Sequence, residues 1–108
     1  MEVEDIVRCL AALAQDTRLA AFRALIAAGP TGLQPTALAA ALAIPANTLS
    51  FHLRALLAAG MITQERQGRT LIYRADFARM RSLIDFLTAD CCGGEPCAAT
   101  INLEPGAA

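Results

Sequence analysis

Tryptophan and lysine are both missing from this chain of 108 residues, and histidine occurs only once, at His52. Aromatic residues make up only 5% of the sequence, whereas Ala and Leu are abundant, which favours helices over strands. No run of about eighteen apolar residues occurs, so we expect no membrane-spanning helix. With one histidine and few acids suited to a pocket, an enzyme ranks last among the function classes considered.

The length predicts a single domain, small enough that dimerisation would increase the apolar surface it buries. The first residues include Glu2, Glu4 and Asp5, whereas a secretory signal begins with basic residues, so we expect a cytoplasmic protein. In that reducing compartment, clustered cysteines more often bind metals or act in redox chemistry than form structural disulfides.

Charge is unevenly distributed along the chain, although the net charge is only −1. Residues 1–44 carry three Arg and four acids, residues 45–81 carry six Arg and two acids, and residues 82–108 carry four acids and no base. The middle third therefore has a net charge of +4 and the last third −4. A nearly neutral protein can bind a polyanion when its positive charge lies on one face, so the middle third is the expected nucleic-acid site.

Apolar periodicity predicts a mainly helical fold with one β-hairpin. The expected elements are helices over 3–14, from Asp16-Thr17 to Gly29, over 35–42, from the break at 45–47 to 59 and from Asp76 onwards, and strands over 61–66 and 69–74. The second helix is expected to bury Leu19, Phe22, Leu25 and Ile26. Gln67-Gly68 is the expected hairpin turn, and the chain after Asp90 is expected to be a loop.

The predicted fold is a winged helix-turn-helix of five helices and one hairpin wing, because it contains a short helix, a tight turn, a longer helix and a basic hairpin in that order. In such folds the second helix of the helix-turn-helix enters the major groove of DNA. Hydroxyl, amide and apolar side chains at the start of that helix suit contacts with base edges, and arginines beside the hairpin tip suit phosphates. The predicted DNA-binding residues are Asn47, Thr48, Ser50, Phe51, His52, Arg54, Arg66 and Arg69. The alternative is a solvated hairpin without a DNA partner, and His52 is expected to make either a local hydrogen bond or a phosphate contact.

Three cysteines lie close together in the segment Asp90-Cys91-Cys92-Gly93-Gly94-Glu95-Pro96-Cys97. Thiolates select thiophilic ions, and three sulfurs without a histidine suit trivalent arsenic or antimony better than zinc, which prefers a fourth ligand. We expect the helix end to unwind so that Cys91 and Cys92 can bind one ion, which the two glycines facilitate. The alternatives are a cluster without a ligand, a disulfide with one thiol left over, and a thiol-based redox or sulfur sensor in which Cys97 forms the bridge.

Three motifs, spread over roughly residues 5–92, resemble the ArsR/SmtB family of metalloregulators. They are Leu13-Ala14-Gln15-Asp16-Thr17-Arg18-Leu19, then Asn47-Thr48-Leu49-Ser50-Phe51-His52-Leu53-Arg54 with Ala59-Gly60-Met61-Ile62, and Gly68-Arg69 with Ile72-Tyr73-Arg74. The resemblance implies a homodimeric transcriptional repressor of a resistance operon, which releases double-stranded operator DNA when it binds its inducer. It implies no catalytic cofactor.

The chain also departs from common patterns of that family. Gln34 and Thr36 stand where many arsenic-responsive members carry a Cys-x-Cys pair, and the last helix has no histidine for a zinc site. The similarity is therefore greatest to members that bind arsenite at the end of the last helix. It implies As(III) or Sb(III) as inducer, with Cys91, Cys92 and Cys97 as ligands.

Apolar stripes on the first and last helices are the predicted dimer interface. Its residues are Ile6, Leu10, Met80, Leu83, Ile84 and Leu87. Cys9 lies one position from the first stripe and is expected to be a partly buried apolar residue. Residues 1–97 are the predicted DNA-binding and sensor domain, and residues 98–108 a mobile tail.

Overall fold

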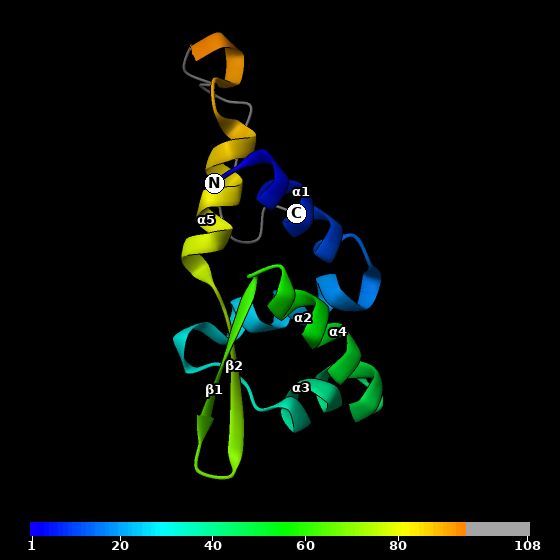
Figure 1. Cartoon of the computed structure of the whole chain (residues 1–108). Helices are drawn as coiled ribbons and strands as arrows, with labels where there is room; N and C mark the ends of the chain where they lie inside the picture. The colour runs from blue at the N-terminus through cyan, green and yellow to red at the C-terminus, as the bar shows by residue number, and fades with distance from the viewer. Residues whose placement is uncertain (95–108) are drawn as a thin grey trace.

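The computed structural model describes residues 1–94, so Cys97 and the tail predicted for 98–108 lie outside the described residues. Five α-helices and one antiparallel hairpin form a mainly helical winged helix-turn-helix, as predicted (Figure 1). The bounds are α1 Val3–Leu13, α2 Asp16–Ala28, α3 Pro35–Leu42, α4 Ala46–Ala58, β1 Ile62–Gln67, β2 Thr70–Ala75 and α5 Phe77–Thr88, with 3-10 turns at Gly29–Thr31 and Cys91–Gly94. No single helix within residues 1–94 is long and apolar enough to cross a membrane, although α3 and α4 meet that criterion as a pair bent by 108°.

The core lies where α1, α2, α3 and α4 meet the base of the hairpin. Its largest fully buried side chains are Leu25, Leu38, Leu49, Leu53, Leu56, Met61 and Cys9. In α4 the buried leucines recur at a spacing of four and three residues, which places them on one helix face. The prediction for α2 was wrong at Leu19, which is 45% exposed. The buried face of α2 instead runs through Ala21, Phe22 and Leu25.

Side-chain caps define where α2 and α5 begin. Asp16-Thr17 was expected to supply the N-cap of α2, but the cap is the preceding residue: Gln15 has extended backbone, and its side chain accepts a hydrogen bond from the Arg18 amide at 2.8 Å. Asp76 begins α5 as predicted, because its carboxylate accepts from the Arg79 amide at 3.0 Å. Each cap satisfies one backbone donor that the first helical turn leaves without a partner.

The hairpin pairs Ile62 with Ala75 at its base and Gln67 with Thr70 at its tip. The loop is therefore Gly68-Arg69, one residue later than predicted, and Gly68 takes the positive φ of 65° that such a turn requires. Leu33 joins the sheet through paired backbone hydrogen bonds with Tyr73 of 2.8 and 2.9 Å. Gly32 permits this approach, because a Cβ there would lie 2.5 Å from the Tyr73 carbonyl oxygen. The wing is thus attached directly to the segment that precedes α3.

Candidate nucleic-acid interface and cysteine site

The two helices α3 and α4 form the helix-turn-helix. They meet at an angle of 108°, within the range of about 90–120° that is typical of the motif. Ala43 makes the turn in a left-handed conformation with φ 55°, and the Ile44 amide donates to the Ala39 carbonyl at 3.1 Å. Ala46 and Ser50 at the start of α4 line one hollow together with Leu71 and Tyr73 of β2, so the start of α4 lies near the wing.

Five of the six predicted contact residues on α4 are exposed: Asn47, Thr48, Ser50, Phe51 and Arg54. Phe51 has 64% of its surface exposed, which is unusual for a large apolar ring and leaves it available to a partner. The side-chain oxygen of Asn47 accepts from the Thr48 amide at 3.0 Å, so the carboxamide nitrogen remains available as a donor. This surface offers hydroxyl, amide and apolar groups, the chemistry that base edges in the major groove require.

His52 differs from its neighbours because it is half-buried and lies against Arg18 of α2. Its Nδ1 is 3.5 Å from the Arg18 guanidinium, whose Nε donates to the Ala12 carbonyl at 2.7 Å. Of the two predicted roles for His52, the structure shows the local hydrogen bond. Arg18 thereby links the end of α1 to α4.

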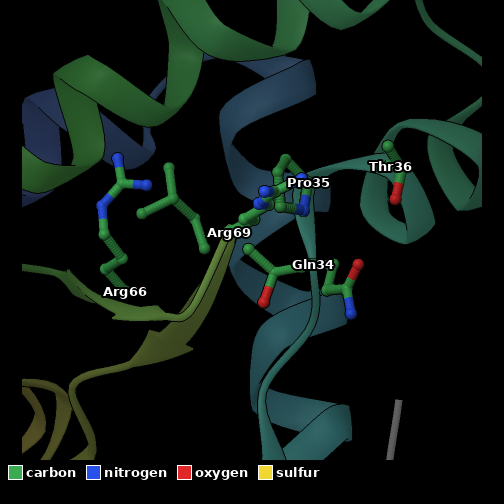
Figure 2. A pocket seen from close by; sticks show the side chains of 7 residues that line it. Gln34, Pro35, Thr36, Arg66 and Arg69 are labelled. Carbon is green, nitrogen blue, oxygen red and sulfur yellow. The ribbon is translucent and has the colours of Figure 1, made fainter.

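The wing contributes two exposed arginines, Arg66 on β1 and Arg69 in the loop. They line a hollow of about 260 Å³ between the wing and the start of α3, together with Gln34, Pro35, Thr36, Thr70 and Leu71 (Figure 2). Two guanidinium groups next to hydroxyl and amide side chains make this hollow suited to an anion such as a phosphate.

Arg74 serves the fold instead. Its Nε donates to the Pro30 carbonyl at 2.7 Å, and its Nη1 lies 2.7 Å from the Glu65 carboxylate. The hydrogen bond from Arg74 lowers the pKa of Glu65 below its ordinary value, and a second bond from Gln67 acts in the same direction. This arginine therefore braces β1 and β2 against the segment after α2 and adds little free positive charge to the surface.

At the far end of α5, Cys91 and Cys92 sit in the turn Cys91–Gly94, where a loop had been predicted. The helix ends at Thr88, and both Asp90 and Cys92 have left-handed backbone with φ 57°. The two Sγ atoms are 3.7 Å apart. The expectation that α5 must unwind to bring these sulfurs together was wrong, because the helix already ends before them.

With both cysteines reduced, two soft donors at this separation would fit a single thiophilic ion. With a metal–sulfur bond of about 2.3 Å, tetrahedral sulfur ligands lie roughly 3.8 Å apart. Cys91 is half-buried and Cys92 exposed, and Cys92 is disulfide-bonded. Within residues 1–94, no three Cys, His, Asp or Glu side chains gather closely enough to hold a metal. The third predicted ligand, Cys97, lies outside the described residues.

Cys9 is more deeply buried than predicted, with no exposed surface. Its thiol donates to the carbonyl of Ala59 at 3.5 Å, joining α1 to the end of α4. Its position beside the apolar stripe predicted a partly buried apolar residue but not this contact with Ala59.

The residues predicted for the dimer interface fall into two groups. Ile6 and Leu83 are 2% and 5% exposed, so they already pack inside their own chain. Leu10 and Leu87 are 40% and 56% exposed, and Met80 and Ile84 are half-buried. Sequence reasoning missed Val3 and Val7, which are 60% and 58% exposed and continue the Leu10 stripe at helical spacing. An apolar face on α1 and α5 thus remains uncovered in the single chain.

Comparisons with known proteins agree with this geometry. A family model described as a helix-turn-helix domain matches residues 13–65. An ArsR-like transcriptional regulator from Rhodococcus sp. RHA1 is 27% identical, with 78% of this chain and 76% of that chain covered and a TM-score of 0.69. The homodimeric winged helix-turn-helix DNA-binding domain of a possible ArsR-family regulator from Mycobacterium bovis is also 27% identical, with 86% of both chains covered and a TM-score of 0.64.

A third solved structure is more similar in sequence. The AntR antimony-specific transcriptional repressor is 32% identical, with 80% of this chain and 77% of that chain covered and a TM-score of 0.64. No curated protein matches the sequence.

Proposed function

Because this chain belongs to the ArsR family of helix-turn-helix transcriptional regulators, we propose that it represses a metalloid-resistance operon and leaves its operator when trivalent arsenic or antimony binds. The observation that carries the proposal is the pair of cysteines at the end of α5, with sulfurs 3.7 Å apart. The similarity to an antimony-specific repressor supports the same class of inducer.

Operator recognition is assigned to the start of α4 and to the wing. Asn47, Thr48, Ser50, Phe51 and Arg54 would read the major groove, because they are exposed at the end of the helix that enters it. Arg66 and Arg69 would hold phosphates from the wing, where the hollow beside α3 offers additional donors. His52 would act through its contact with Arg18, which positions α4.

The inducer is assigned to Cys91, Cys92 and Cys97. Arsenite in neutral water is the uncharged As(OH)3, and each thiol can replace one hydroxide: an As–S bond forms, an As–O bond breaks, and the thiol proton leaves in water. Three thiols give As(SR)3 and three waters, and the lone pair of arsenic occupies the fourth direction. The reaction requires Cys92 in its reduced form.

Homodimerisation is assigned to the apolar face of α1 and α5. Leu10, Leu87, Val3 and Val7 are its exposed members. A dimer would present two recognition helices to half-sites about one DNA turn apart, and the similar Mycobacterium bovis domain is homodimeric.

The test replaces Cys91, Cys92 or Cys97 singly by Ser in the full chain. Each variant is expected to bind the operator with wild-type affinity and to lose release by arsenite, measured by fluorescence anisotropy with labelled operator. An ultraviolet titration of the thiolate–arsenic absorption in the reduced protein should lose amplitude in parallel. Cys9→Ser is the matched control, because this buried thiol only donates to Ala59, as a serine hydroxyl also can. Normal release of a Cys97→Ser variant would reject the three-thiolate site and leave a two-thiol site at Cys91 and Cys92.

A redox-sensing repressor is the second candidate, favoured by the disulfide at Cys92. Two thiols and one hydrogen peroxide would give one disulfide and two waters. In that case peroxide, rather than arsenite, should release the operator, and dithiothreitol should restore binding. Loss of one of the three thiols should also be tolerated if the remaining two can form the bridge.

A further inference from the structure

The C-terminal end of α4 has an unusual set of hydrogen-bond partners. Its last turn closes through the amide of Met61, which donates to the Leu56 carbonyl at 3.1 Å, and the amide of Gly60, which donates to the Leu57 carbonyl at 3.0 Å. With Gly60 at φ 77°, this is the Schellman arrangement. It satisfies the carbonyls of Leu56 and Leu57 but leaves that of Ala59 to find its partners elsewhere.

Two other helices supply those partners. The Ala59 carbonyl accepts from the Cys9 thiol of α1 at 3.5 Å and from the Arg79 guanidinium of α5 at 3.2 Å. Ala59 is only 3% exposed, so water has little access to compete for these bonds. The positive charge of Arg79 also suits the negative end of the α4 dipole. Therefore α1 and α5, the two helices with uncovered apolar faces, both donate a hydrogen bond to the same oxygen atom at the end of the recognition helix.

Arg79 fits closely against the end of α4. A Cβ at residue 60 would lie 3.2 Å from the Arg79 Nε, so glycine leaves the space that the guanidinium occupies. The amide of Asp76 donates to the Met61 carbonyl at 2.9 Å, and the Asp76 carboxylate accepts from the Arg79 amide. The first turn of α5 is thus tied to the end of α4 by backbone as well as side chain.

A buried nitrogen of Arg79 lowers the net cost of breaking its hydrogen bond to Ala59. Among the described residues, Arg79 Nε is the buried side-chain nitrogen without a hydrogen-bond partner. A buried donor without a partner carries a desolvation cost, which it recovers when it reaches water. Moving Arg79 outwards therefore loses the bond to Ala59 but hydrates Nε, and the two effects partly cancel.

We propose that Arg79 is a positioning residue for operator recognition, which transmits the position of α5 to the recognition helix α4 through the Ala59 carbonyl. The inference rests on the proposed function in that α4 reads the operator. The cysteine turn and Arg79 lie at opposite ends of α5, a rigid element of about 18 Å at 1.5 Å per residue. A change at the cysteines that tilts α5 would displace Arg79 and free the end of α4.

The experiment compares Arg79→Met with Arg81→Met in the full chain. Both changes remove one positive charge from α5, but the Arg81 side chain is 77% exposed, and its ion pair within residues 1–94 is with Asp85 of its own helix. Arg79→Met is expected to weaken operator binding at least about tenfold, the lower end of what one hydrogen bond to a charged group contributes. It should change binding to random DNA no more than Arg81→Met does. Hydrogen exchange at the amides of Gly60 and Met61 should accelerate in Arg79→Met alone.

Arg79→Lys keeps the charge and one donor, so its operator affinity and exchange should lie between those of wild type and Arg79→Met. Equal operator affinities and exchange rates in Arg79→Met and Arg81→Met would overturn the proposal, as would equal losses on operator and random DNA. If Arg79→Met does not fold, Arg79→Lys decides instead: operator affinity and exchange rates equal to those of wild type would overturn the proposal. None of these measurements uses an inducer. Failure of arsenite to release the wild-type protein would therefore reject the proposed inducer, whereas operator affinity and hydrogen exchange of the variants decide the role of Arg79.

Discussion

The wing and the end of α5 lie at opposite ends of the folded chain (Figure 1). They differ in charge and in the ligands that their side chains offer. The wing carries two exposed arginines, and its strands are braced by the ion pair of Arg74 with Glu65. The end of α5 carries Asp85 and Asp90 and leads into a turn with two cysteines. One end therefore attracts a polyanion while the other repels it, and the second end offers soft ligands instead.

If the cysteines bind the inducer as proposed, sensing and DNA binding should be separable by substitutions at the two ends, but not in the region between them. Removal of a thiol at the end of α5 should then leave the operator contacts intact. Under the proposal above, communication between the ends passes through α5 to the end of α4, where Arg79 donates to the Ala59 carbonyl. Allosteric coupling of this kind is typically worth about 1–3 kcal/mol.

The largest expected effect comes from breaking the dimer. Leu87→Asp should give monomers and weaken operator binding on the order of a hundredfold, because a bivalent contact becomes monovalent. Leu87 is 56% exposed, so the change should leave the fold intact, whereas Asp at the buried Leu83 would destabilise the core. Ser82→Asp adds the same charge at an exposed position of α5 and is the control. Sedimentation should show the change in mass, and a Leu87→Asp variant that stays a tight dimer would refute the interface.

Next in size is the loss of base readout at the start of α4. Asn47→Ala or Ser50→Ala should weaken operator binding by about 1–3 kcal/mol, the value of a good base contact, and should affect random DNA much less. Ser82→Ala on α5 is the matched control for loss of an exposed hydroxyl. Competition binding with operator and scrambled DNA measures the difference. Equal losses on both DNAs would show that these residues contact phosphate.

A smaller effect, which changes the salt dependence of binding rather than its sequence preference, is expected from the wing. Arg69→Ala should weaken all DNA sequences alike and reduce the slope of log affinity against log salt by about 1, because one phosphate contact is lost. Arg81→Ala removes the same charge from α5 and should leave the slope nearly unchanged. An unchanged slope for Arg69→Ala would exclude a phosphate contact and weaken the contrast between the two ends.

The smallest expected effect concerns the ion pair that braces the wing. Since the Arg74 hydrogen bond lowers the pKa of Glu65, the ion pair is fully present above the ordinary pKa of Glu, about 4.3. Its contribution is lost as the pH falls through the lowered value. Thermal unfolding of wild type and Glu65→Gln should therefore differ slightly at pH 7 and converge at low pH. A difference that grows on acidification would contradict this assignment.

Local signals predicted most of the architecture from the sequence. α3 begins at Pro35 and ends at Leu42 as predicted, and Asp76 caps the start of α5, because such signals act within one helical turn. The change from helical to alternating periodicity located the hairpin, although its loop is one residue later than predicted. The basic middle third and the cysteine cluster were visible in the order of residues along the chain.

The sequence by itself thus determined the order of the elements, the segregation of charge and the presence of soft ligands near the end of the last helix. Only the tertiary structure decided which side chains face one another. It placed Cys9 against Ala59, 50 residues away, and Arg74 against Pro30, 44 residues away. It also exposed Leu19 and buried Ile6. The physical reason is that periodicity and capping act over a few residues, whereas these contacts depend on how distant segments pack in three dimensions.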